Sequence, residues 1–95
     1  MNGFTKKKIK TLTLGEKLKK LRSDRRISLN EVFRATGIQI KYLEYLENGD
    51  YDKLPADVYT KGFLRSYADF LGVDRNIFLK TYQKEKGIKQ NLKKN

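Results

Sequence analysis

The sequence of 95 residues predicts an all-α fold, a five-helix bundle that contains a helix-turn-helix. Three observations support this fold class. Apolar residues recur at the three- and four-residue spacing of amphipathic helices. Side chains that cap helix N-termini precede the apolar runs, and glycines follow them. No segment alternates between apolar and polar residues for long enough to predict a strand.

The first helix is predicted to begin after Thr13. Thr13 and Glu16 have the spacing of a capping box, in which each side chain hydrogen-bonds to the other residue's backbone N–H. Leu14, Leu18 and Leu21 then recur on one face of the helix. This helix should extend to about Arg25.

A helix-turn-helix is predicted from the next two apolar runs. Ser28 and Glu31 form a second capping box, and Gly37 ends the short helix that follows them. A further helix should cover Gln39 to Glu47 and stop at Asn48-Gly49. Two short helices joined at Gly37-Ile38 have the helix-turn-helix layout. Its expected core residues are Leu29, Val32, Phe33, Ile38, Leu43 and Leu46.

Two more helices are predicted after a connecting loop at residues 51–54. Pro55 suits the first turn of the fourth helix, which should run to Leu71 and stop at Gly72. Asp74 can cap the fifth helix, which is expected to end near Gly87. The apolar residues of this last helix are Ile77, Phe78 and Tyr82.

The composition argues against an enzyme and against a metal site or cofactor. The chain has no cysteine and no histidine, which excludes disulfides, thiolate metal sites and the usual acid–base side chain. Asn48, Asp50 and Asp52 have the alternate spacing of calcium ligands. Lys53 and Tyr59 occupy the positions where a calcium loop needs glycine and glutamate, so calcium binding is rejected.

The net charge of +11 lies mostly at the two ends of the chain. We therefore divide it into a basic arm (1–13), a helix-turn-helix domain (14–86) and a basic tail or juxtamembrane linker (87–95). Solvated ends are the simplest interpretation of such charge. A phosphate-binding arm and a membrane-facing tail are the alternatives.

The third helix is the candidate DNA-binding element. Gln39 and Lys41 suit base reading in the major groove, whereas Glu44 opposes phosphate. Residues 28–49 carry a net charge of −1, which gives little phosphate neutralisation. The layout thus favours DNA binding, but the chemistry favours weak or non-specific binding. Candidate DNA contacts are Gln39, Ile40, Lys41, Tyr42 and Tyr45, with Lys6, Lys7 and Lys8 of the arm.

The fourth helix has more apolar surface than one core face requires. Leu64, Tyr67, Ala68 and Leu71 form a compact stripe. Aromatic residues widen this stripe to roughly 180°, against the roughly 100° of an ordinary surface helix. They are Tyr59, Phe63 and Phe70.

Surplus aromatic residues of this kind often anchor protein–protein interfaces. Alternatively, the fifth helix or the loop at Tyr51 covers them. Lys61 and Arg65 border them and could pair with acidic groups of a partner, while Gly62 predicts a close helix crossing or a partner's close approach.

Residues 54–68, LPADVYTKGFLRSYA, resemble the signature of the RodZ family. Residues 14–18 (LGEKL), 36–38 (TGI) and 42–47 (YLEYLE) agree with it, so the resemblance extends from about Leu14 to Asp74. RodZ proteins are bacterial, and their cytoplasmic helix-turn-helix domain precedes a single membrane span. The resemblance implies a lambda-repressor-like fold.

The resemblance also implies a role in cell shape. The family's domain binds the actin-like filament protein MreB through two aromatic residues one turn apart, which map onto Tyr59 and Phe63. We expect a cytoplasmic, monomeric adaptor domain, attached to a membrane only through a span that this chain lacks. The alternative is a DNA-binding helix-turn-helix regulator.

Overall fold

The helices in the computed structural model confirm the predicted all-α fold. The structure describes residues 12–94, with side chains described to residue 88, and this part of the chain contains no strand. Lys6, Lys7 and Lys8 lie outside it. The elements are α1 (Leu14–Asp24), α2 (Leu29–Thr36), α3 (Ile40–Asn48), the 3-10 helix η2 (Tyr51–Lys53), α4 (Asp57–Leu71) and α5 (Arg75–Lys94).

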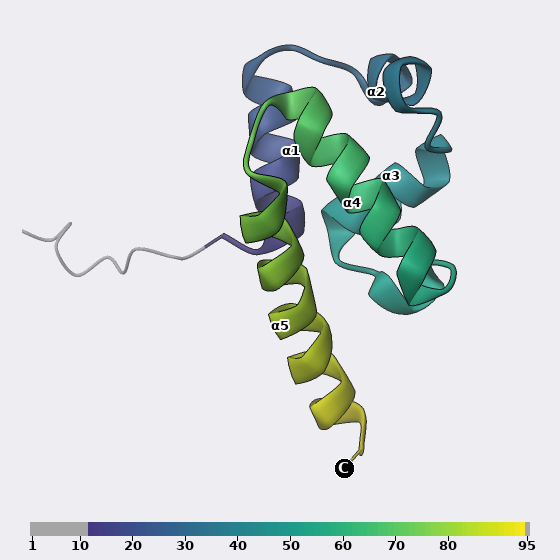
Figure 1. Ribbon diagram of the computed structural model, residues 1–95, viewed down its shortest axis with the longest axis vertical. Coiled ribbons are helices and arrows are strands. Elements are labelled where there is room, and N and C mark those ends of the chain that lie inside the picture. The colour runs from purple at the N-terminus through teal and green to yellow at the C-terminus, as the bar shows by residue number, and fades with distance from the viewer. Residues whose placement is uncertain (1–11, 95) are drawn as a thin grey trace, which may run out of the picture.

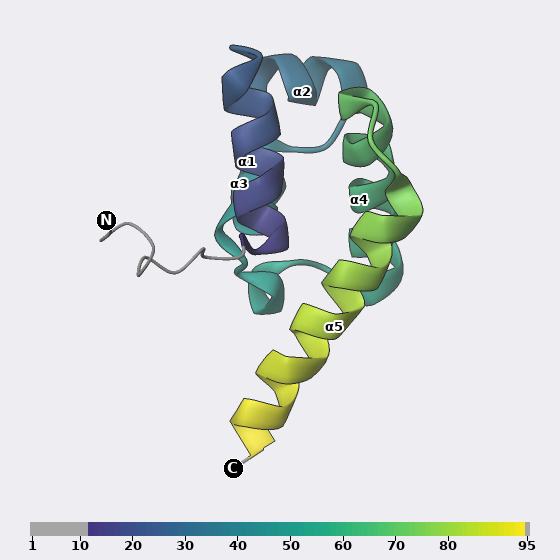
Figure 2. The same cartoon turned by 90° about the vertical axis from the view of Figure 1, so that its left-hand side faces the viewer.

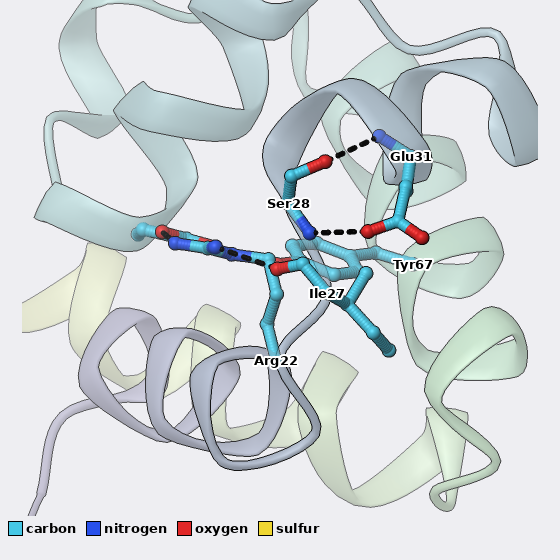
Figure 3. A network of polar contacts seen from close by, with 6 residues as sticks. Arg22, Ile27, Ser28, Glu31 and Tyr67 are labelled. Carbon is cyan, nitrogen blue, oxygen red and sulfur yellow. Dashed lines mark hydrogen bonds and ion pairs between the residues drawn. The ribbon is translucent and has the colours of Figure 1, made fainter.

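Local capping signals set the starts of α1 and α2 as predicted. The Thr13 backbone N–H donates to the Glu16 carboxylate at 2.9 Å, and the Glu16 N–H donates to the Thr13 hydroxyl at 3.1 Å. Ser28 and Glu31 make the same pair of bonds at 2.8 and 3.1 Å (Figure 3). Gly37 follows α2 with a φ of 79°, a left-handed conformation that glycine adopts without strain.

The core lies where α1, α3, α4 and α5 meet. Helix α1 packs on α3, and α4 packs on α2 and α5. Figures 1 and 2 show α2 crossing one end of the body, while α5 follows α4 and then extends past the other helices. The core side chains are Leu14, Leu18, Val32, Ile38, Leu43, Leu46, Tyr51, Leu64, Tyr67, Ala68, Leu71, Phe78 and Tyr82.

Helix α4 begins later than predicted, because Pro55 lies before the helix rather than in its first turn. The first helical backbone bonds are accepted by Ala56, whose carbonyl takes the Tyr59 N–H at 2.9 Å. The Pro55 carbonyl instead accepts the Thr60 hydroxyl at 3.2 Å. Asp57 is therefore the first residue of α4.

Helix α5 is longer than predicted, because it continues through Gly87 to Lys94. A single helix-interior glycine costs about 1 kcal/mol relative to alanine, which contacts on the preceding turn can offset. The predicted boundary between residues 86 and 87 thus falls inside a continuous helix. None of the helices in the described part of the chain is long and apolar enough to cross a lipid bilayer.

One prediction about burial and one about secondary structure are wrong. Phe33 is 39% exposed, because Val32, one position earlier on α2, takes the place in the core. Tyr51 is buried and belongs to a 3-10 helix rather than to a loop, while the other two residues of that helix are exposed. Its hydroxyl donates to Glu85 of α5 at 2.6 Å, so the burial depends on a residue far away in the sequence.

Candidate partner-binding surface

Helix α4 has two sides with opposite environments. Its inner side carries Leu64, Tyr67 and Leu71, which are all buried in the core. Its outer side carries Val58, 69% exposed, and Tyr59, 63% exposed. The predicted core stripe of this helix is therefore confirmed. Neither α5 nor the segment at Tyr51 covers Tyr59.

A buried polar network fixes the inner side. The Tyr67 hydroxyl donates to the Glu47 carboxylate of α3 at 2.5 Å. Arg22 of α1 donates to the two oxygens of the same carboxylate at 2.7 and 2.9 Å. Arg22 also donates to the Ile27 carbonyl at 2.9 Å (Figure 3). A two-bond guanidinium–carboxylate pair has a defined geometry. The network therefore locks the rotation of α4 relative to α1 and α3.

The pKa values of Tyr67 and Arg22 in this network are both raised. Burial raises the pKa of the Tyr67 hydroxyl well above its usual range, and the hydrogen bond to Glu47 raises it further. The hydrogen bond to Glu47 also raises the pKa of the Arg22 guanidinium. Tyr67 is thus a neutral donor and Arg22 a fixed cation at any physiological pH. Sequence reasoning placed Tyr67 in the core but did not identify its two charged partners.

The first turn of α4 is held by α5. The Asp57 carboxylate accepts the Tyr82 hydroxyl at 2.7 Å and the Lys86 ammonium at 2.9 Å. Lys61, one turn along α4, pairs with the same carboxylate at 3.1 Å. Hydrogen bonds from Lys86 and Tyr82 hold the pKa of Asp57 well below its usual range. Lys61 is therefore engaged within the chain, on the side of α4 that faces α5.

Two aromatic residues from different helices meet one helical turn along α4 from Tyr59. The rings of Tyr42 in α3 and Phe63 in α4 stack at a centroid distance of 5.4 Å and an interplanar angle of 21°. Both side chains are half-buried against the core. Tyr45 lies 6.3 Å from Tyr42, between ring centroids. We call Tyr42, Tyr59 and Phe63 the aromatic seam.

The remaining predicted contacts on α4 have mixed surroundings. Arg65 is half-buried and makes no ion pair with any residue that the structure describes. Phe70 is half-buried and lines a shallow hollow with Ala35 and Thr36 of α2 and with Ser66. The hollow lies between α2 and the carboxyl-terminal half of α4.

The predicted DNA-binding residues are divided by the structure. Gln39, Ile40 and Lys41 are exposed around the start of α3. Tyr42 turns instead toward α4, as its stack on Phe63 shows. Tyr45 is half-buried, with the Lys53 ammonium 5.7 Å from the centroid of its ring. The amino end of α3 is therefore open to a ligand, while Tyr42 of this helix joins the aromatic seam. No group of acidic side chains among the described residues could hold a metal ion.

Gly15 in the first turn of α1 and Gly62 in the middle of α4 have opposite surroundings. A Cβ added to Gly15 would lie 2.2 Å from the Glu47 backbone oxygen, so α1 crosses α3 at this glycine. A Cβ added to Gly62 would meet no heavy atom within 4 Å. Of the two alternatives predicted for Gly62, the close helix crossing is therefore absent from the described residues, and the close approach of a partner stays a prediction. Gly15, which sequence reasoning missed, makes such a crossing.

The comparisons with known proteins agree with this architecture. A family model described as a helix-turn-helix domain matches residues 17–78. The cytoskeleton protein RodZ of Streptococcus pneumoniae is 40% identical over 70 residues, which are 74% of this chain and 25% of that protein. The membrane protein YmfM of Bacillus subtilis, which is uncharacterised, is 36% identical over 59 residues, which are 62% of this chain and 20% of that protein. The chain therefore spans a quarter or less of these relatives.

Two solved structures are similar to the chain. A chain from the complex of the bacterial actin MreB with the cell shape protein RodZ is 36% identical, with a TM-score of 0.74. The structure of YmfM from Staphylococcus aureus, described as a candidate DNA-binding membrane protein, is 35% identical, with a TM-score of 0.72. Each match covers 78% of this chain and 90% of the other.

Proposed function

We propose that this chain, which belongs to the helix-turn-helix domain family and is homologous to the cytoskeleton protein RodZ, is a non-catalytic adaptor that binds an MreB filament through the outer side of α4. One observation carries the proposal: Tyr59 is a large aromatic residue, 63% exposed, beside the half-buried Phe63 on a rigid helix. Aromatic anchors on a fixed scaffold are typical of protein interfaces.

The surroundings of these two residues support a preformed surface. The Arg22–Glu47–Tyr67 network fixes the rotation of α4, and the Asp57 contacts hold its first turn. Tyr59 and Phe63 are therefore presented with little freedom left to lose on binding, which favours affinity. We assign Arg65 and Phe70 to the edge of the same surface. Lys61 contributes less, because its ammonium is already paired with Asp57.

The test is filament binding by the double variant Tyr59→Ala and Phe63→Ala. Co-sedimentation with polymerised MreB of the same bacterium should weaken by at least about 30-fold, because interface anchors typically contribute 2 kcal/mol or more. The matched control is the double variant Ile77→Ala and Ile88→Ala, which removes two exposed side chains from α5. Circular dichroism must show unchanged helix content in both. Normal filament binding by the aromatic double variant would refute the proposal.

DNA binding is the second candidate, favoured by the exposed Gln39, Ile40 and Lys41 around the start of α3. A specific reader should retain one duplex sequence over others at physiological salt and should lose that preference in Gln39→Ala and Lys41→Ala. Binding that ignores sequence and disappears with added salt would indicate only the attraction between lysines and phosphates.

A further inference from the structure

Gly62 has no intramolecular reason to be glycine. It lies in the middle of α4 without the positive φ that favours glycine, and a Cβ would meet nothing within 4 Å. Glycine in a helix interior is less stable than alanine, because the unfolded chain gains backbone freedom. At Gly15 the close contact with α3 explains the glycine, but the described part of the chain supplies no such contact at Gly62.

The missing side chain leaves a notch in the outer side of α4. Helical spacing places Val58 and Tyr59 one turn before Gly62 and Ser66 one turn after it. Val58 and Tyr59 are among the most exposed large apolar residues of the described chain, and Ser66 is small and exposed. The backbone of α4 at Gly62 is therefore accessible between the aromatic seam and Val58.

We infer that Gly62 is the point at which the bound filament protein approaches the α4 backbone most closely, with an apolar side chain of that partner seated in the notch. This inference rests on the proposed function. It adds a specificity requirement, since any side chain at position 62 would hold the partner away from Tyr59 and Phe63. Because the notch is continuous with Tyr59, a partner bound at Tyr59 would also occupy the notch, which leaves no room there for a second ligand.

The experiment is a size series at position 62, with Gly62→Ala and Gly62→Leu, measured in two ways. Thermal unfolding should show a Tm raised by about 2–8 °C in Gly62→Ala, since the site is open and alanine is the better helix former. Co-sedimentation with polymerised MreB should weaken by about tenfold in Gly62→Ala and by more in Gly62→Leu. A purely structural glycine would not move the two readouts in opposite directions.

Gly87→Ala is the matched control, because Gly87 is also helix-interior and open, but it lies on α5. It should raise the Tm similarly and leave filament binding unchanged. The inference alone would be overturned by two results together: Gly62→Leu binds filaments as well as the unmodified chain does, and the double variant Tyr59→Ala and Phe63→Ala does not bind them. Normal binding by the aromatic variant would overturn the proposed function as well.

A second copy of this chain is the competing occupant of the notch. Sedimentation velocity of the chain without filaments separates the two cases. A monomer at all concentrations agrees with the inference. A dimer that dissociates in Gly62→Leu would overturn it, because the notch would then serve self-association.

Discussion

Tyr59 and Tyr67 lie two turns apart on α4 and have opposite roles. Tyr67 has no exposed surface, and its hydroxyl donates to a charged partner on α3. Tyr59 is 63% exposed. The same side chain therefore serves the core on one side of the helix and an open surface on the other. This difference depends on the rotation of α4 about its axis, which the bond from Tyr67 to the Arg22–Glu47 pair fixes. The following predictions test the separation between the buried and the exposed side of α4.

The largest effect is expected at Glu47. Glu47→Ala should lower the free energy of unfolding by about 3–5 kcal/mol, because it leaves the Arg22 charge and the Tyr67 hydroxyl buried without their partner. Urea denaturation followed by circular dichroism measures the loss. The control is Glu44→Ala on the exposed side of the same helix, which should stay within about 0.5 kcal/mol of the unmodified chain. Equal stability of the two variants would show that the inner side does not depend on this network.

The next effect is expected at the crossing of α1 and α3. Gly15→Ala should lower the free energy of unfolding by about 1–3 kcal/mol, because the added methyl group would clash with the Glu47 backbone oxygen. Urea denaturation measures this change too. A gain in stability, as expected for an open helix position, would contradict the close packing at Gly15.

A smaller effect is expected in the aromatic seam. Tyr42→Ala should lower the free energy of unfolding by about 1 kcal/mol beyond the loss from reduced burial, because it removes the stack on Phe63. Tyr42→Phe keeps the ring and should be nearly neutral. A double-mutant cycle that combines Tyr42→Ala with Phe63→Ala in urea denaturation isolates the stack. A loss of stability as large as that of Glu47→Ala would contradict the view that the aromatic seam contributes less to stability than the buried network does.

The smallest effect is expected at Asp57, and it depends on pH. The pKa of Asp57 is lower in the folded chain than its ordinary 3.8, so its contribution to stability is present above about pH 4 and is lost as the pH falls further. At neutral pH, Asp57→Asn should cost less than about 1 kcal/mol, because the pair is partly exposed. The difference between the two proteins should shrink in unfolding experiments toward pH 2. If the difference in free energy of unfolding between the two proteins does not change with pH, the contribution of Asp57 comes from packing rather than from its charge.

Features set by neighbouring residues could be predicted from the sequence. The starts of α1 and α2 depend on Thr13, Glu16, Ser28 and Glu31, whose bonds span only three residues. The all-α class and the core side of α4 follow from helical periodicity. These features need no knowledge of the rest of the fold.

Features set by distant residues could not be predicted. Glu47 is charged and buried, which makes sense only once Arg22 and Tyr67 lie beside it. Tyr51 is buried because Glu85, on the last helix, accepts its hydroxyl. The sequence predicted the aromatic surplus of α4, but the stack of Phe63 on Tyr42 joins residues that had been assigned to different ligands.

Because α5 is continuous, the rotation of its carboxyl-terminal end around the helix axis is fixed relative to the rest of the domain. Glu85 accepts the Leu14 backbone N–H at 2.8 Å and Lys86 pairs with Asp57, so this part of the helix is fixed to α1 and α4. The backbone then continues without a break to Lys94. Inserting one residue after Ile88 would turn everything beyond it by about 100° around the helix axis and advance it by about 1.5 Å. The continuous helix therefore fixes the backbone of residues 89–94 relative to the aromatic seam, both in distance along the helix axis and in rotation around it.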